Sequence, residues 1–141
     1  MKKQKIYIFG NPLLDFDNLP IKLAPKLREI FPEIDFAITD PNENLKPVDG
    51  ELNIIDTAEG IKKITVLDDI SKIEASSAFS LHDFDLAFNL KLLQKIGELK
   101  RVKIFCVPMQ GDEKDILEQL EKSIINLLTS YEGRCSERTE G

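Results

Sequence analysis

The chain is poor in the residues from which common metal and redox sites are built: it has one histidine and two cysteines in 141 residues. A single histidine excludes a His-Glu-x-x-His motif and every site made of histidines alone. The cysteines, Cys106 and Cys135, lack the spacing of a redox or zinc motif, and a disulfide framework is not expected. Cys106 lies in an apolar run and is predicted to be a buried thiol outside any disulfide, which suits a reducing cytoplasm.

Glycine-rich loops and long apolar runs are also missing. Gly10 stands alone after the first apolar run, so the chain has neither a dinucleotide fingerprint nor a P-loop. No Gly-x-Ser-x-Gly segment marks a nucleophilic serine, although composition alone allows a Ser-His-Asp triad. No segment approaches the about 18 uninterrupted apolar residues that span a membrane, and the N-terminus lacks the cleavage pattern of a signal peptide.

Positive charge is in deficit. The 25 acidic residues outnumber the 19 lysines and arginines, which gives a net charge of −6. An acidic surface attracts neither nucleic-acid phosphates nor anionic lipids. We therefore expect a cytoplasmic protein that binds no nucleic acid and inserts into no membrane. The sequence indicates no oligomeric state.

Strand-like and helix-like patterns alternate along the chain. Short β-rich runs end at turn residues, and amphipathic stretches lie between several of them. This alternation predicts one α/β domain over residues 1–131, a three-layer α/β/α sandwich whose twisted, five-stranded sheet is mostly parallel with one antiparallel edge strand. Residues 132–141 are polar and are predicted to form a disordered tail. The expected strands are 5–9, 34–39, 52–55, 63–67 and 101–107, and the expected helices run from Pro20 or Pro25 to residue 31, over 83–96 and over 112–128.

Polar side chains that suit metal binding flank three of these elements. Asp15 and Asp17 follow the first strand, Asp56 ends the third, and His82 precedes the helix over 83–96. Ligands of open α/β sheets bind outside the carboxyl ends of the strands, so we expect these side chains to meet at that edge. Two carboxylates and one imidazole suit nickel, zinc or cobalt better than calcium, and they leave positions open for water or substrate.

Each of these residues also has an ordinary structural interpretation. Asp56 suits an Asx turn or a helix cap, Asp15 and Asp17 suit helix caps, and a lone histidine is more often structural than a ligand. Asp56 is also where a receiver-like or flavodoxin-like binding module would carry a phosphoacceptor. A receiver-like module should have an acidic pair directly after the first strand and a lysine after the fifth, and this chain has neither.

The order of the segments resembles that of the hydrogenase maturation endopeptidases. Residues 10–17 resemble the loop after the family's first strand, residues 56–58 its turn after the third, and residues 80–82 the segment that opens a long helix. The resemblance covers residues 5–130. It implies an α/β/α sandwich around a twisted five-stranded sheet. It also implies an endopeptidase that removes the C-terminal extension of a nickel–iron hydrogenase large-subunit precursor after nickel insertion.

The resemblance assigns the metal ligands to Asp17, Asp56 and His82, with nickel supplied by the precursor and with zinc or cadmium as substitutes in crystals. The family has two adjacent acids in the first loop. Here one residue separates Asp15 from Asp17, so Asp15 is an alternative first ligand. Asp40 matches the acid of a turn after the second strand, although the family's glycines are absent there. Asp15 or Asp40 is the candidate base for a water molecule. A non-catalytic hydrogenase assembly factor of the same fold is the alternative function.

Overall fold

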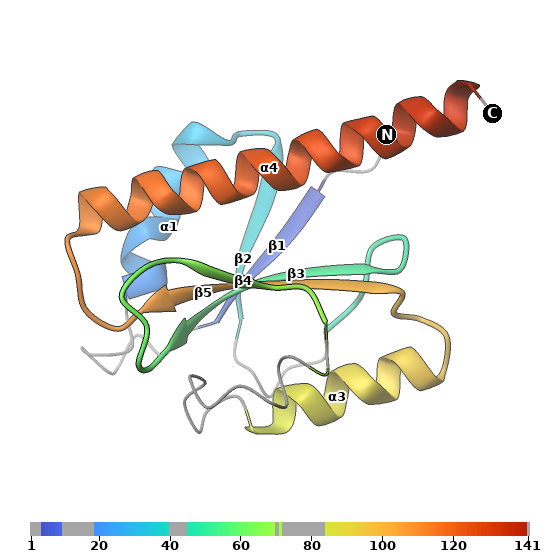
Figure 1. Cartoon of the computed structure of the whole chain (residues 1–141), viewed down its shortest axis with the longest axis horizontal. Coiled ribbons are helices and arrows are strands. Elements are labelled where there is room, and N and C mark those ends of the chain that lie inside the picture. The colour runs from blue at the N-terminus through green and yellow to red at the C-terminus, as the bar shows by residue number, and fades with distance from the viewer. Residues whose placement is uncertain (1–3, 10–18, 40–44, 70, 72–83, 141) are drawn as a thin grey trace.

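The structure is a computed structural model of the chain, and it describes residues 4–9, 19–39, 45–69, 71 and 84–140 (Figure 1). Five strands form one sheet in the order β2-β1-β3-β5-β4. β4 pairs antiparallel with β5 at one edge, and the other neighbours pair in parallel, as the sequence predicted. The strands are β1 (Gln4–Phe9), β2 (Ile34–Thr39), β3 (Glu51–Ala58), β4 (Thr65–Leu67) and β5 (Arg101–Pro108).

The inner strands are buried along nearly their whole length, whereas the edge strand β2 alternates between buried and exposed residues. A strand covered on both faces is apolar over most of its buried length, as in β1 and β5, whereas β3 also buries Asn53, Asp56 and Thr57. β5 contributes Cys106, which is buried as predicted and is in the thiol form. The burial pattern thus places three strands in the middle of a sandwich.

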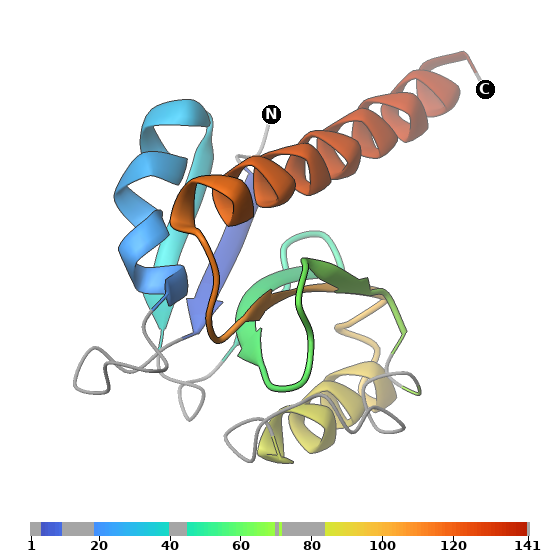
Figure 2. The same ribbon diagram turned by 60° about the vertical axis from the view of Figure 1, so that its left-hand side comes forward.

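Helices cover both faces of the sheet (Figures 1 and 2). α1 (Leu19–Ile30) and α4 (Glu113–Glu140) lie on one face, and α3 (Phe84–Lys95) lies on the other. The first face is packed by residues such as Ile8, Leu27 and Ile124. The second is packed by Ile54, Leu90 and Ile104, among others. The predicted three-layer sandwich is therefore confirmed. Among the described helices, none is long and apolar enough to cross a membrane.

The ends of two helices were predicted in part. α1 begins at Leu19, one residue before Pro20, the first of the two predicted starts, and contains Pro25, the second, in its interior. Pro25 is exposed, so water can satisfy the backbone carbonyl that the proline ring leaves without a donor. α4 continues to Glu140, where a disordered tail was expected after residue 131. The apolar periodicity ends near Leu128, so the signal that predicted the helix stops there while the helical backbone continues.

Candidate functional site

The carboxyl ends of β1 and β3 lie side by side where the strand order reverses. From β1 the chain crosses to β2 on one side, and β3 with β5 lies on the other. The register pairs Ile8 with Ile55, so Phe9 and Asp56 are the next residues on the two strands. Ligands of open α/β sheets bind in the crevice outside such a reversal. Asp56 is therefore next to the position at which this fold favours a binding site.

Asp56 is a buried carboxylate, with 6% of its surface exposed. It lies two residues inside β3 rather than at its end, because pairing with β5 continues through Thr57 and Ala58. Its cross-strand neighbour is Cys106, which packs on the α3 face of the sheet. The Thr57 backbone N–H donates to Oδ1 of Asp56 at 2.8 Å. The helix-cap interpretation is wrong, since β3 continues through Ala58 and no helix begins directly after Asp56.

The burial of Asp56 has an energetic consequence. An ionised carboxylate is costly in an apolar interior unless hydrogen bonds, an opposite charge or a bound cation compensate for the lost water. The hydrogen bond from Thr57 also fixes the orientation of the carboxylate, since it ties Oδ1 to the backbone of the same strand. Asp56 is thus a buried carboxyl group of fixed orientation near the carboxyl edge of the sheet.

Thr57 is a polar residue that the sequence did not single out. Its Oγ1 is buried, and the described part of the chain provides no hydrogen-bond partner for it. Successive residues of a strand face opposite sides of a sheet, so Thr57 shares the α1 and α4 face with Ile55. No sequence signal marked Thr57, because a threonine in a β-rich run is an ordinary strand residue.

Four other predicted site residues, Asp15, Asp17, Asp40 and His82, lie outside the described residues. The structure does fix the elements that flank them. The segment with Asp15 and Asp17 follows Phe9 at the end of β1, and Asp40 follows Thr39 at the end of β2; Phe9 and Thr39 are register partners. That these side chains meet Asp56 stays a prediction. Among the residues that are described, no three acids, cysteines or histidines gather to hold a metal ion.

His82 comes two residues before α3, which lies on the same face of the sheet as Asp56. Figure 1 shows α3 running antiparallel to β3 and β5, so the helix begins at the carboxyl edge. α3 ends at Lys95, and Gly97, whose φ is +82°, turns the chain after it; the Glu98 N–H donates to the Leu93 carbonyl at 3.0 Å. The chain therefore enters α3 at the carboxyl edge of the sheet, and Asp56 lies near that same edge.

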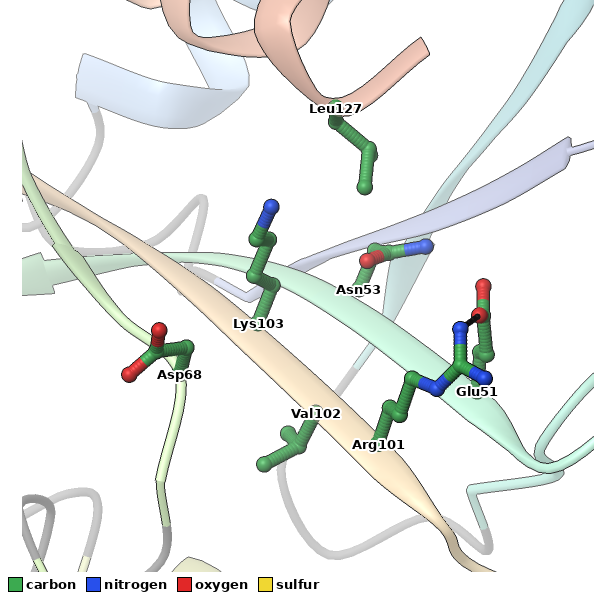
Figure 3. Close-up of a pocket in the computed structure, with 7 residues that line it drawn as sticks. All are labelled: Glu51, Asn53, Asp68, Arg101, Val102, Lys103 and Leu127. Carbon is green, nitrogen blue, oxygen red and sulfur yellow. Dashed lines mark hydrogen bonds and ion pairs between the residues drawn. The ribbon is translucent and has the colours of Figure 1, made fainter. Parts of the chain in front are cut away.

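A pocket of about 280 Å³ lies at the opposite, amino edge of the sheet (Figure 3). Glu51 and Arg101, the first residues of β3 and β5, form an ion pair across it at 3.0 Å. Lys103 and Asp68 add one further charge of each sign to the lining. The charges are balanced, so the pocket favours neither an anion nor a cation. No sequence pattern indicated this pocket, and it lies at the other end of the strands from Asp56.

Comparisons with known proteins bear on the fold. No protein-family model and no curated protein matches the sequence. The solved structure of the hydrogenase maturating endopeptidase HybD from E. coli is similar, with a TM-score of 0.66 and 18% identity, covering 90% of this chain and 93% of that chain. A hydrogenase 2 maturation peptidase from a Thaumarchaeota archaeon gives a TM-score of 0.47 and 15% identity, with coverages of 93% and 99%. The chain therefore has the α/β fold of HybD, the fold that the sequence resemblance implied.

Proposed function

We propose that this chain is an endopeptidase that removes the C-terminal extension of a nickel–iron hydrogenase large-subunit precursor once nickel has been inserted. The observation that carries the proposal is the buried, oriented carboxylate of Asp56 at the strand-order reversal of a fold shared with HybD. The order of the sequence segments around Asp17, Asp56 and His82 supports the same conclusion.

In this proposal the metal belongs to the substrate. Asp17, Asp56 and His82 contact the nickel of the precursor, with Asp15 as the alternative to Asp17. Carboxylate and imidazole donors suit nickel. The hydrogen bond to Oδ1 already orients the Asp56 carboxylate, so this side chain loses less conformational entropy when it binds the metal. Because the nickel arrives with the precursor, the chain distinguishes a loaded precursor from an empty one.

The cleavage step adds water across one peptide bond. The water oxygen bonds to the carbonyl carbon, the carbon–nitrogen bond breaks, and the proton passes through a carboxylate to the leaving amine. Asp15 or Asp40 is the proposed base, because Asp56 is assigned to the metal. A nearby divalent cation makes the carbonyl carbon more electrophilic.

The test uses purified precursor with and without nickel. We expect the chain to release the C-terminal peptide from the loaded form only, as followed by the mass of the products. Asp56→Asn should abolish the release. Asp35→Asn is the matched control, since it makes the same substitution at an exposed position of β2. Equal cleavage of both precursor forms would disprove nickel recognition. Binding of the loaded precursor without any cleavage would instead identify a non-catalytic assembly factor.

A further inference from the structure

The outward face of α3 carries a line of large apolar side chains. Phe88, Leu92 and Ile96 are 63%, 46% and 67% exposed, and we call them the α3 stripe. Residues four apart lie on the same side of a helix, and the Ile96 N–H still donates to the Leu92 carbonyl at 3.1 Å. The stripe is therefore continuous over a length of about 12 Å.

The α3 stripe is not the packing side of the helix. Leu90 and Leu93, on the opposite side, make the contacts with the sheet. The other helices differ: each has one large hydrophobic residue that is exposed, Ile30 in α1 and Ile125 in α4, as far as their side chains are described. Single exposed apolar residues are normal on protein surfaces, whereas a contiguous line of them indicates an interaction site.

The sequence of the stripe is positively charged, although the whole chain carries −6: residues 88–97 contain two lysines and no acid. Lys95 is exposed and follows Leu92 by three residues. An acidic apolar segment of another protein would complement this surface. The net negative charge opposes an anionic membrane. Two copies joined through this surface would bring lysines together.

The direction of α3 connects the stripe with the candidate site. The helix runs from the carboxyl edge of the sheet to the amino edge (Figures 1 and 2). The stripe accordingly leads from Ile96 at the amino edge towards the end at which Asp56 lies. A polypeptide lying along α3 is thereby directed to the proposed cleavage site.

We propose that the α3 stripe, together with Lys95, docks an acidic amphipathic segment of the precursor and so presents its C-terminal extension to the carboxyl edge. This inference rests on the proposed function. Docking of this kind acts on substrate binding and not on the chemical step. Its loss therefore raises KM and leaves kcat at saturating precursor unchanged.

The test pairs variants of α3 with chemically equal variants of α4. Phe88→Ser with Leu92→Ser removes the apolar part, and Lys95→Glu reverses one charge. Ile125→Ser and Lys122→Glu are the controls. Both residues are exposed, and both are in α4 on the other face of the molecule. We expect each α3 variant to raise KM and the Kd for the precursor at least about tenfold, with kcat within about twofold. The control variants should match the wild type.

Three outcomes would overturn the docking proposal: an unchanged KM and Kd in the α3 variants, an equal rise in the α4 variants, or no binding of precursor by the wild type. Self-association or binding to phosphatidylserine vesicles that the α3 variants alone abolish would also overturn it. A wild type that binds the precursor without cleaving it, and loses binding in the α3 variants, would refute the cleavage function while supporting docking. Phe88→Leu and Lys95→Arg should restore wild-type binding.

Discussion

The two faces of the sheet are covered in different ways. On one face α1 and α4 pack together over residues such as Ile8 and Phe105, and their outward surfaces are mainly polar. On the other face α3 is the one described helix, and it turns Phe88 and Leu92 outward. Asp56 lies on the α3 face, while its neighbour Thr57 faces α1 and α4. In the proposed function, the α3 face carries recognition and chemistry, and the α1 and α4 face serves mainly stability.

The largest effect should come from a cavity in the two-helix face. Leu27 of α1 is fully buried, so Leu27→Ala should lower the free energy of unfolding by about 2–5 kcal/mol. Urea unfolding followed by circular dichroism measures this change. The cleavage rate of the folded fraction should stay close to that of the wild type, because Leu27 is in the helix layer away from Asp56. A folded Leu27→Ala protein with strongly reduced cleavage would contradict the assignment of stability to one face and of activity to the other.

The next effect concerns Asp56 itself. Asp56→Asn retains the size of the side chain and removes its charge, and we expect the rate of precursor cleavage to fall at least about 100-fold. The free energy of unfolding should fall much less than in Leu27→Ala, since the amide oxygen can still accept from the Thr57 N–H. Cleavage kinetics and urea unfolding on the same preparation separate these two effects. A variant with unchanged cleavage would remove Asp56 from the site.

A smaller change in stability is expected at Thr57, which follows Asp56 in β3 and faces the other side of the sheet. Thr57→Val replaces the buried hydroxyl, which has no partner among the described residues, with a methyl group. We expect the free energy of unfolding to rise by about 1 kcal/mol, because an unsatisfied buried polar group is removed. Cleavage should be unchanged. A fall in stability would mean that the hydroxyl makes a stabilising hydrogen bond. A fall in cleavage would mean that the α1 and α4 face also contributes to activity.

The smallest effect concerns stability at the surface of α3. Phe88→Ser removes a side chain that is mostly exposed, so the free energy of unfolding should change by no more than about 0.5 kcal/mol. Leu90→Ala, two residues further along the same helix, should cost about 2–5 kcal/mol because Leu90 is fully buried. Similar losses in the two variants would show that Phe88 belongs to the core and not to a docking surface.

The sequence predicted the fold well because its apolar runs carry the necessary information. Residues 34–39 were predicted as a strand and form β2 with those bounds. The extent of β3 was underestimated, because Asp56 and Thr57 look like the end of a strand although the ladder with β5 continues past them. Backbone pairing does not depend on side-chain polarity, so a polar pair inside a ladder gives no local signal.

The candidate site was predictable in part. The sequence singled out Asp56 because an acid after an apolar run is visible in it, and parallel strand order places such an acid at a known edge. Thr57 and the α3 stripe were not found. The helix around Phe88, Leu92 and Ile96 has apolar residues on more than one side, and only packing decides which side faces the sheet. The sequence pattern therefore shows that this helix is rich in apolar residues and does not show which of them face the sheet.

The long pairing of β3 with β5 also determines when the site comes into existence. Glu51 and Arg101 begin this parallel ladder and are 50 residues apart in the chain. Such a ladder requires closure of a long loop before its contacts become favourable, which makes it a slow step of folding. Asp56 acquires its buried surroundings only when that loop has closed. A chain still folding after synthesis therefore lacks the buried surroundings of Asp56, and the proposed activity begins only with the completed sheet.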